Sequence, residues 1–165
     1  MECEIVPVSE KLISGYRQAI DTVAKEGKYF AFDQAAPLHL ITQIVRRNIA
    51  LGHPQYVVMH EGCVSGWCEI IPYNMWVCDP HAGTLCMGLM PALRGRGIGR
   101  RLINYVVEAA LSVRFSRIDL MVRASNTAAI TLYSSIGFEL EGVHQKAIRN
   151  ADDYEDVYSM ALMHR

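Results

Sequence analysis

One segment of the chain constrains its fold more than any other: a glycine-rich loop that joins a strand pattern to a long helix pattern. Residues 84–90 are rich in apolar and β-forming side chains and end at Pro91, and Gly95, Gly97 and Gly99 follow. Beyond the loop, apolar residues recur at helical spacing, at Ile98, Leu102, Val106, Ala109 and Val113. A strand that leads through a glycine loop into an amphipathic helix predicts a layered domain of sheet and helices.

The same loop has the properties of an anion-binding site. Glycines let backbone N–H groups approach a phosphate, and a helix start adds unpaired donors and the positive end of the helix dipole. Residues 94–100 therefore suit a pyrophosphate group, although a lone glycine pair is also explained by a tight turn. Two better-known phosphate loops are excluded. The GxGxxG pattern fails because residue 100 is arginine, and no Lys-Ser/Thr pair follows the glycines as in a P-loop.

Strand and helix patterns alternate along the rest of the chain. Strands are expected at residues 2–8, 56–60, 64–71, 118–123, 138–149 and 154–163, and helices at residues 9–25, 37–51 and 126–136. Ser9 and Asn126 are the expected N-caps, and Gly52 and Gly137 the expected helix ends. This order predicts an α+β (α/β layered) fold with a mixed sheet.

Composition limits the partners and the compartment. Sixteen basic residues face seventeen acidic ones, so no overall positive field favours nucleic acid or an anionic membrane. The N-terminal residues lack a basic n-region, and no window approaches the apolar length of a membrane span. Without repeats or linkers, residues 1–165 are expected to form a single domain, and five unpaired cysteines favour a cytoplasmic location.

A zinc site deserves consideration because Cys78 and His81 form a CxxH pair near Cys68 and Cys86. Structural zinc usually requires four ligands arranged as two tight pairs, and this chain has one such pair. We therefore predict no metal.

A second motif follows the strand that ends near Arg123. It consists of Asn126, an alanine-rich turn, Leu132-Tyr133 and Gly137-Phe138. Taken alone, Asn126 is a helix cap and Tyr133 an aromatic residue on an inner helix face.

Together the two motifs resemble those of the GNAT superfamily of N-acetyltransferases. The family signature is Gln or Arg, two variable residues, Gly, one variable residue, and Gly or Ala, which Arg94, Gly97 and Gly99 match. The resemblance covers about residues 56–163. The tail, residues 141–160, is similar to the subgroup that includes phosphinothricin and amino-acid N-acetyltransferases.

The resemblance implies a mostly antiparallel central sheet of about seven strands, flanked by about four helices. It also implies acetyl-CoA as co-substrate, with the pyrophosphate on the backbone amides of residues 95–100. Asn126 would contact CoA, the Tyr133 hydroxyl would meet the departing sulfur, and a backbone N–H in residues 88–90, most suitably Leu89, would meet the oxyanion. The implied cofactor-binding residues are Leu89, Met90, Arg94, Gly95, Arg96, Gly97, Ile98, Gly99, Arg100, Asn126 and Tyr133.

Acetyl transfer to an amine also requires a base, because an amine like that of lysine is mostly protonated at neutral pH. Glu69 is the candidate because it is a charged residue among apolar neighbours in Trp67-Cys68-Glu69-Ile70, although it also suits a solvent-facing position on a strand. His81 is an alternative base.

The expected acceptor is a primary amine of a small molecule such as an amino acid. A protein N-terminus or lysine is the alternative, and the resemblance also permits a homodimer. Two other classes stay open: a catalytically inactive CoA-binding sensor or interaction domain, and a nucleotide-binding domain without acetyl chemistry.

Overall fold

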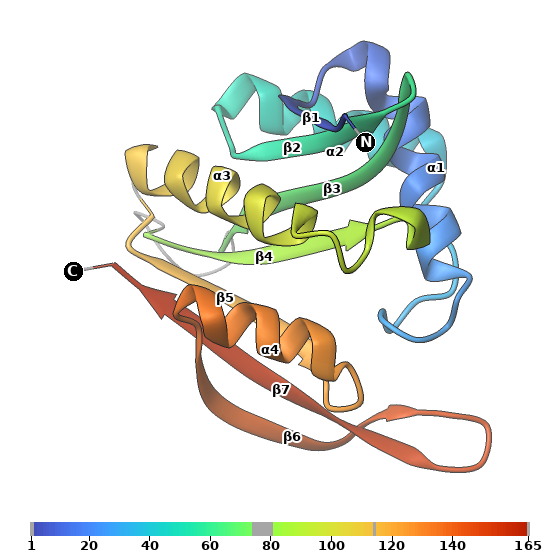
Figure 1. Ribbon diagram of the computed structural model, residues 1–165, viewed down its shortest axis with the longest axis vertical. Coiled ribbons are helices and arrows are strands. Elements are labelled where there is room, and N and C mark those ends of the chain that lie inside the picture. Colours follow the sequence, from blue (N-terminus) through green and yellow to red (C-terminus); the bar gives the residue numbers. More distant parts are fainter. Residues whose placement is uncertain (1, 74–80, 114, 165) are drawn as a thin grey trace.

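A computed structural model describes residues 2–73, 81–113 and 115–164 of the chain. It contains a seven-stranded sheet with the strand order β1-β2-β3-β4-β5-β7-β6 (Figure 1). All neighbouring strands are antiparallel except β4 and β5, which are parallel. The predicted α+β fold with a mixed, mostly antiparallel sheet is confirmed.

The elements follow one another in an order close to the expected one. The strands are β1 (Glu4–Pro7), β2 (Gln55–His60), β3 (Cys63–Pro72), β4 (Ala82–Leu89), β5 (Arg117–Arg123), β6 (Glu139–Arg149) and β7 (Tyr154–Met163). The α-helices are α1 (Ile13–Ala24), α2 (Leu38–Leu51), α3 (Ile98–Val113) and α4 (Thr127–Ile136). Short 3-10 turns at Glu10–Leu12 and Pro91–Leu93 precede α1 and the glycine loop.

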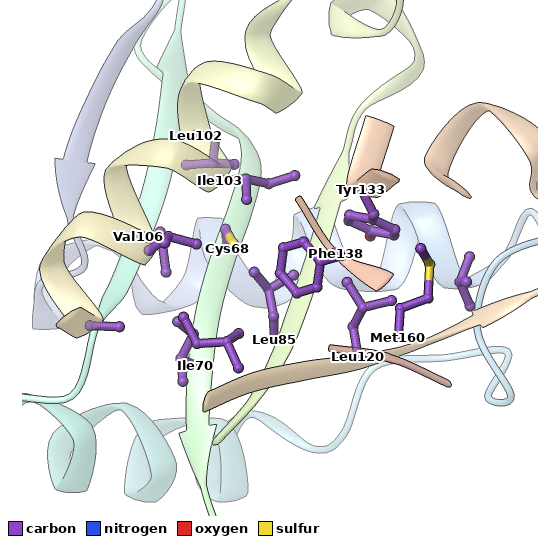
Figure 2. Close-up of a cluster of buried hydrophobic side chains, with 14 of the residues drawn as sticks. Cys68, Ile70, Leu85, Leu102, Ile103, Val106, Leu120, Tyr133, Phe138 and Met160 are labelled. Carbon is purple, nitrogen blue, oxygen red and sulfur yellow. The ribbon is translucent and has the colours of Figure 1, made fainter. Parts of the chain in front are cut away.

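The helices form one layer on each face of the sheet. α3 and α4 lie on one face and α1 and α2 on the other (Figure 1). Side chains alternate between the two faces along a strand. Cys68 and Ile70 of β3 thus pack with α3, whereas Trp67 packs with α1 and α2. Figure 2 shows the first of these cores, in which Tyr133 of α4 and Phe138 lie among the side chains of β3, β4, β5 and β7.

Some sequence-based boundaries were wrong for local reasons. Ser9 precedes only the 3-10 turn and makes no side-chain capping bond, so α1 begins at Ile13. In α2, Ile41 and Val45 are buried, whereas Ile44 and other apolar residues are exposed. A helical pattern locates an apolar stripe, but it does not say whether a partner covers all of it.

The sheet opens near its centre. β4 and β5 pair only from Ala82 with Arg117 to Thr84 with Asp119, although β4 continues to Leu89. Beyond Thr84, β4 stays paired with β3 but no longer pairs with β5, so β4 and β5 diverge. Backbone groups on the inner edges of the two strands are therefore left facing a gap.

Within the part of the chain that the structure describes, no helix combines the length and apolarity that crossing a bilayer requires.

Candidate active site

A cleft of about 480 Å³ opens where β4 and β5 diverge. Its walls come from the end of β4, the glycine loop, the start of α3, α4 and the loop after α1. Most of the predicted site residues line it, namely Leu89, Arg94, Gly95, Gly97, Gly99, Arg100, Asn126 and Tyr133. Four other predicted residues, Glu69, Met90, Arg96 and Ile98, lie outside that lining.

The glycine loop presents a series of backbone amides at the start of α3. Gly95 and Gly97 have φ values of +69° and +76°, a conformation that side chains disfavour. The Arg101 N–H donates to the Gly97 carbonyl, so the amides of residues 98–100 precede the hydrogen-bond ladder of the helix. A Cβ added to Gly99 would lie 3.2 Å from Leu132 of α4. The loop therefore combines a helix N-terminus with close access to the cleft.

Helix α4 supplies the opposite wall. The Asn126 side chain accepts a hydrogen bond from the Ala129 N–H at 3.3 Å, which confirms the predicted N-cap, and Gly137 ends the helix in the left-handed conformation. Tyr133 is 8% exposed, lines the cleft, and packs its ring 5.8 Å from that of Phe138. Burial raises the pKa of the Tyr133 hydroxyl, so the hydroxyl is protonated at neutral pH.

The backbone N–H and C=O groups at the end of β4 point alternately toward β3 and away from it. The Met90 N–H donates to the Ser65 carbonyl on the β3 side at 2.9 Å, so that amide is already used. Backbone groups alternate in direction along an antiparallel strand, so those of Leu89 point away from β3, toward the gap. The Leu89 carbonyl there accepts a hydrogen bond from the Arg94 Nε at 2.9 Å. Of residues 88–90, the predicted range for an oxyanion donor, Leu89 is the one whose amide faces the gap.

Arg94 directs its side chain into the protein. Its Nη1 and Nη2 atoms donate to the Glu26 carboxylate at 2.9 and 2.5 Å, and Nη1 also donates to the Tyr29 hydroxyl at 3.1 Å. The guanidinium carbon lies 4.8 Å from the centre of the Tyr29 ring. The hydrogen bond from Arg94 lowers the pKa of the Glu26 carboxyl. The Nη1 and Nη2 donors of the motif arginine are thus engaged by residues that follow α1.

Glu69 is buried in a hydrogen-bonded network on the face covered by α1 and α2. Its carboxylate accepts from the Tyr16 hydroxyl at 2.9 Å and from the Gln55 amide at 2.7 Å. Burial raises the pKa of Glu69 to about 7, although both hydrogen bonds oppose the shift. The solvent-facing alternative is therefore wrong. Glu69 pairs across the ladder with Cys86 of β4, two residues beyond the last β4–β5 pair.

A second cleft of about 430 Å³ adjoins the first and shares Tyr29, Asn126 and Ala128 with it. Its lining is polar apart from the Tyr29 ring and small aliphatic groups, and it includes Lys28 and Arg123. The remaining lining residues are Gly27, Ser125, Thr127 and Asn150, which come from the loops after α1 and β5, the start of α4 and the β6–β7 turn.

The candidate zinc ligands are Cys68, Cys78, His81 and Cys86. Cys78 lies outside the described residues, and His81 is exposed just before β4. Among the described residues, no group of three or more His, Cys, Asp or Glu side chains is arranged to hold a metal ion.

Sequence reasoning missed one wall of both clefts. Tyr29 lines both clefts, Phe30 lines the first and Arg123 lines the second. Glu26 precedes them and binds Arg94. Arg123 ends the predicted strand of residues 118–123, and it is only 8% exposed. A buried arginine in that position signals carbonyl or carboxylate partners, but the sequence does not reveal that the partners belong to the loop after α1.

Comparison with known proteins places the chain among acetyltransferases. A model of the acetyltransferase (GNAT) family matches residues 20–138. The chain is 41% identical over 70 residues to the N-alpha-acetyltransferase RimI of Mycobacterium tuberculosis, a match covering 41% of this chain and 42% of that protein. It is 36% identical over 72 residues to the ribosomal protein bS18-alanine N-acetyltransferase of Salmonella typhimurium, covering 44% and 49%. These matches span less than half the length of either relative.

The fold is similar to that of a GNAT superfamily phosphinothricin acetyltransferase from Sinorhizobium meliloti, whose structure is a complex with acetyl-CoA. The TM-score is 0.90 at 17% identity, over 99% of this chain and 89% of that one. Such an identity shows the fold alone and does not assign the predicted subgroup. Because the family model spans more than half of the 165 residues, the chain belongs to the acetyltransferase (GNAT) family.

Proposed function

We propose that this protein is an N-acetyltransferase that transfers the acetyl group of acetyl-CoA to an α-amino group. One observation carries the proposal: a single cleft at the diverging strands gathers the glycine-loop amides, Asn126 and the protonated Tyr133 hydroxyl. These residues come from two motifs about thirty positions apart in sequence, and they line the same cleft.

The cleft fits acetyl-CoA in its chemistry. The amides of residues 95–100 would hold the pyrophosphate, because the start of α3 supplies N–H groups that precede the hydrogen-bond ladder of the helix, together with the positive end of the helix dipole. The Asn126 Oδ1 is engaged by the helix cap, so its amide nitrogen would meet the ligand. Bound acetyl-CoA would supply an acetyl group activated as a thioester.

Tyr133 and Leu89 would perform complementary tasks at the reacting end. The Tyr133 hydroxyl, which burial keeps protonated, would donate a hydrogen bond to the departing sulfur. The Leu89 N–H, directed into the gap, would donate to the acetyl oxygen as negative charge develops there.

Glu69 is the proposed base. A pKa of about 7 suits proton removal at neutral pH, and its place opposite Cys86 puts it next to the gap on the α1 and α2 side. Because Glu69 lies outside the cleft lining, a chain of water would have to carry the proton from the amine.

The acceptor would enter through the second cleft, since that cleft adjoins the first and shares Tyr29 and Asn126 with it. A polypeptide N-terminus is the acceptor that the relatives favour, since they are named as N-alpha- and ribosomal-protein-alanine acetyltransferases. A free amino acid is the second candidate, because the cationic Lys28 in the lining favours an acceptor that carries a carboxylate.

A matched acceptor panel tests the proposal. Thiol release from acetyl-CoA would be followed with a short alanine-initiated peptide, the same peptide with its N-terminus blocked and one internal lysine, and free alanine. Release with the open peptide alone supports the polypeptide acceptor, and release with free alanine supports the amino acid. Binding of acetyl-CoA without thiol release for any acceptor would instead favour a CoA-binding sensor.

A further inference from the structure

We propose that Arg94 and Arg123 form a clamp that holds the loop of residues 26–30 across the diverging ends of β4 and β5. In this arrangement Arg94 is a positioning residue and not a phosphate ligand. The inference rests on the proposed function for its catalytic consequence, although the clamp itself is a property of the ligand-free protein.

Each arginine comes from one side of the gap. Arg94 follows β4 and binds the Leu89 carbonyl at the end of that strand, then reaches Glu26 and Tyr29 of the loop. Arg123 ends β5 and reaches the same loop from the other side. Its Nη1 and Nη2 atoms donate to the carbonyls of Gly27 and Phe30 at 3.1 and 2.7 Å.

The loop they hold is a wall of both clefts. Tyr29 and Phe30 line the first cleft, while Gly27, Lys28 and Tyr29 line the second. Phe30 also packs against Trp67 of the core, with ring centres 5.9 Å apart. Movement of this loop would therefore change the shape of the acetyl-CoA site and of the proposed acceptor site together.

The burial of Arg123 is a second indication that its side chain holds the loop. Its side chain is 10% exposed, and its Nε is the one buried side-chain nitrogen or oxygen in the described residues that lacks a hydrogen-bond partner. Leaving a buried donor unpaired is costly, and native proteins tolerate few such groups. The Nη atoms of Arg123 thus donate to the two loop carbonyls and to Glu155, while its Nε stays without a partner.

The arrangement separates two roles for the motif arginine. If Arg94 bound phosphate directly, its N–H donors would point to the place beside the glycine loop where the pyrophosphate is proposed to lie. They face Glu26, Tyr29 and the Leu89 carbonyl instead. Removing the Glu26 charge should then reproduce the loss of Arg94, because either change breaks the same bidentate pair.

The first test compares acetyl-CoA with acetyl-pantetheine, which lacks the nucleotide and the pyrophosphate. Arg94→Gln and Glu26→Gln should each raise KM about tenfold with little change in kcat, and the double variant should add little to either. The same factor should appear with acetyl-pantetheine. An Arg94→Gln effect that disappears with acetyl-pantetheine, together with an unaffected Glu26→Gln variant, would make Arg94 a phosphate ligand and overturn the clamp.

Arg117→Gln is the matched control. Arg117 also forms a bidentate pair with a glutamate, Glu141, but on the β5–β6 side of the sheet and outside both clefts. Its replacement should leave KM unchanged, which would show that loss of an arginine–glutamate pair alone does not raise it.

The second test needs no activity. The Glu26 and Gly27 amides donate to the Val23 and Ala24 carbonyls, so their hydrogen exchange reports on the start of the loop. In the ligand-free protein this exchange should be about tenfold faster in Arg94→Gln and Arg123→Lys, and unchanged in Arg117→Gln. Unchanged exchange in both clamp variants would refute the clamp even if the wild type is active. Faster exchange in the clamp variants, together with a wild type that shows no transferase activity, would support the clamp and refute the proposed function.

Discussion

Tyr133 combines two properties that a purely structural tyrosine does not need together. Its ring is packed in the core beside Phe138 (Figure 2), and Tyr133 also lines the cleft. The sequence motif pointed to the residue, while its location on the wall facing the glycine loop follows only from the packing of α4 on the sheet.

Tyr133→Phe separates the two properties. The change keeps the ring and nearly all the buried area, so stability should be close to that of the wild type. Loss of the hydroxyl should lower kcat by about ten- to a thousandfold with KM for acetyl-CoA nearly unchanged, because the hydrogen bond would be made mainly as charge develops on sulfur. Steady-state kinetics of the folded variant measure this. A wild-type kcat would remove Tyr133 from the proposed machinery.

Glu69 should make the protein less stable as pH rises. Its folded pKa, about 7, is above the ordinary value of 4.5, so the folded state binds more protons than the unfolded state between these values. The contribution of Glu69 to the free energy of unfolding is fully present below pH 4.5 and is lost as pH rises through about 7. Glu69→Gln removes the dependence, so its stability relative to the wild type should increase by about 2 kcal/mol between pH 5 and pH 8.

Urea unfolding of both proteins at the two pH values measures that difference. A constant difference would mean that Glu69 titrates near its ordinary pKa. In that case Glu69 would be a poor base at neutral pH. If instead its pKa is about 7, kcat/KM of the wild type should rise with pH near pH 7.

At the scale of elements, the glycine loop was the part of the site best predicted from sequence. Strand, loop and helix were expected, and the structure places β4, the loop and α3 in that order. The motif helix was also predicted with both ends, because Asn126 and Gly137 have the local chemistry of caps. These features depend on contacts within a few residues, which a sequence pattern records directly.

The rest of the site depends on contacts between distant segments. Arg94 meets Glu26 across 68 positions, and Arg123 meets the Gly27 carbonyl across 96. No local pattern encodes such a pairing. The burial of Glu69 was likewise undetermined, since its neighbours allowed either face, and it is decided by Tyr16 of α1 and Gln55 of β2.

The glycine loop can be tested against a loop of the same backbone type. Gly97→Asp and Gly99→Asp should abolish acetyl-CoA binding, because each carboxylate adds bulk and negative charge at the proposed pyrophosphate site. Gly62→Asp is the matched control for Gly97→Asp. Gly62 also has positive φ, +75°, with no atom within 4 Å of an added Cβ, but it lies in the β2–β3 turn. Calorimetry should show wild-type affinity for Gly62→Asp, and wild-type affinity for Gly97→Asp would contradict the assignment.

At the scale of the whole molecule, the divergence of β4 and β5 creates the site. Every other neighbouring pair of strands runs antiparallel, and the parallel pair is the one that separates. Helices on both faces then place α3 and α4 on one side of the gap and the loop after α1 on the other (Figure 1). The layered class was predictable from the alternation of patterns, but the position of the opening was not.

We also propose that the protein forms a homodimer. The outward side of α2 exposes Leu40, Ile44 and Leu51, an apolar stripe that a second copy would cover. Sedimentation equilibrium should give a mass near twice 18.5 kDa at high concentration. A single species of 18.5 kDa across the concentration range would exclude the dimer.

Acetyl transfer itself is tested most directly with labelled acetyl-CoA and a peptide that has one free α-amino group. For the wild type, label should appear on the peptide N-terminus in equal amount to the CoA thiol released, and Gly99→Asp should produce neither. Tight binding of acetyl-CoA by the wild type with no label on any acceptor and no thiol release would contradict the proposed activity and identify a CoA-binding protein without transferase chemistry.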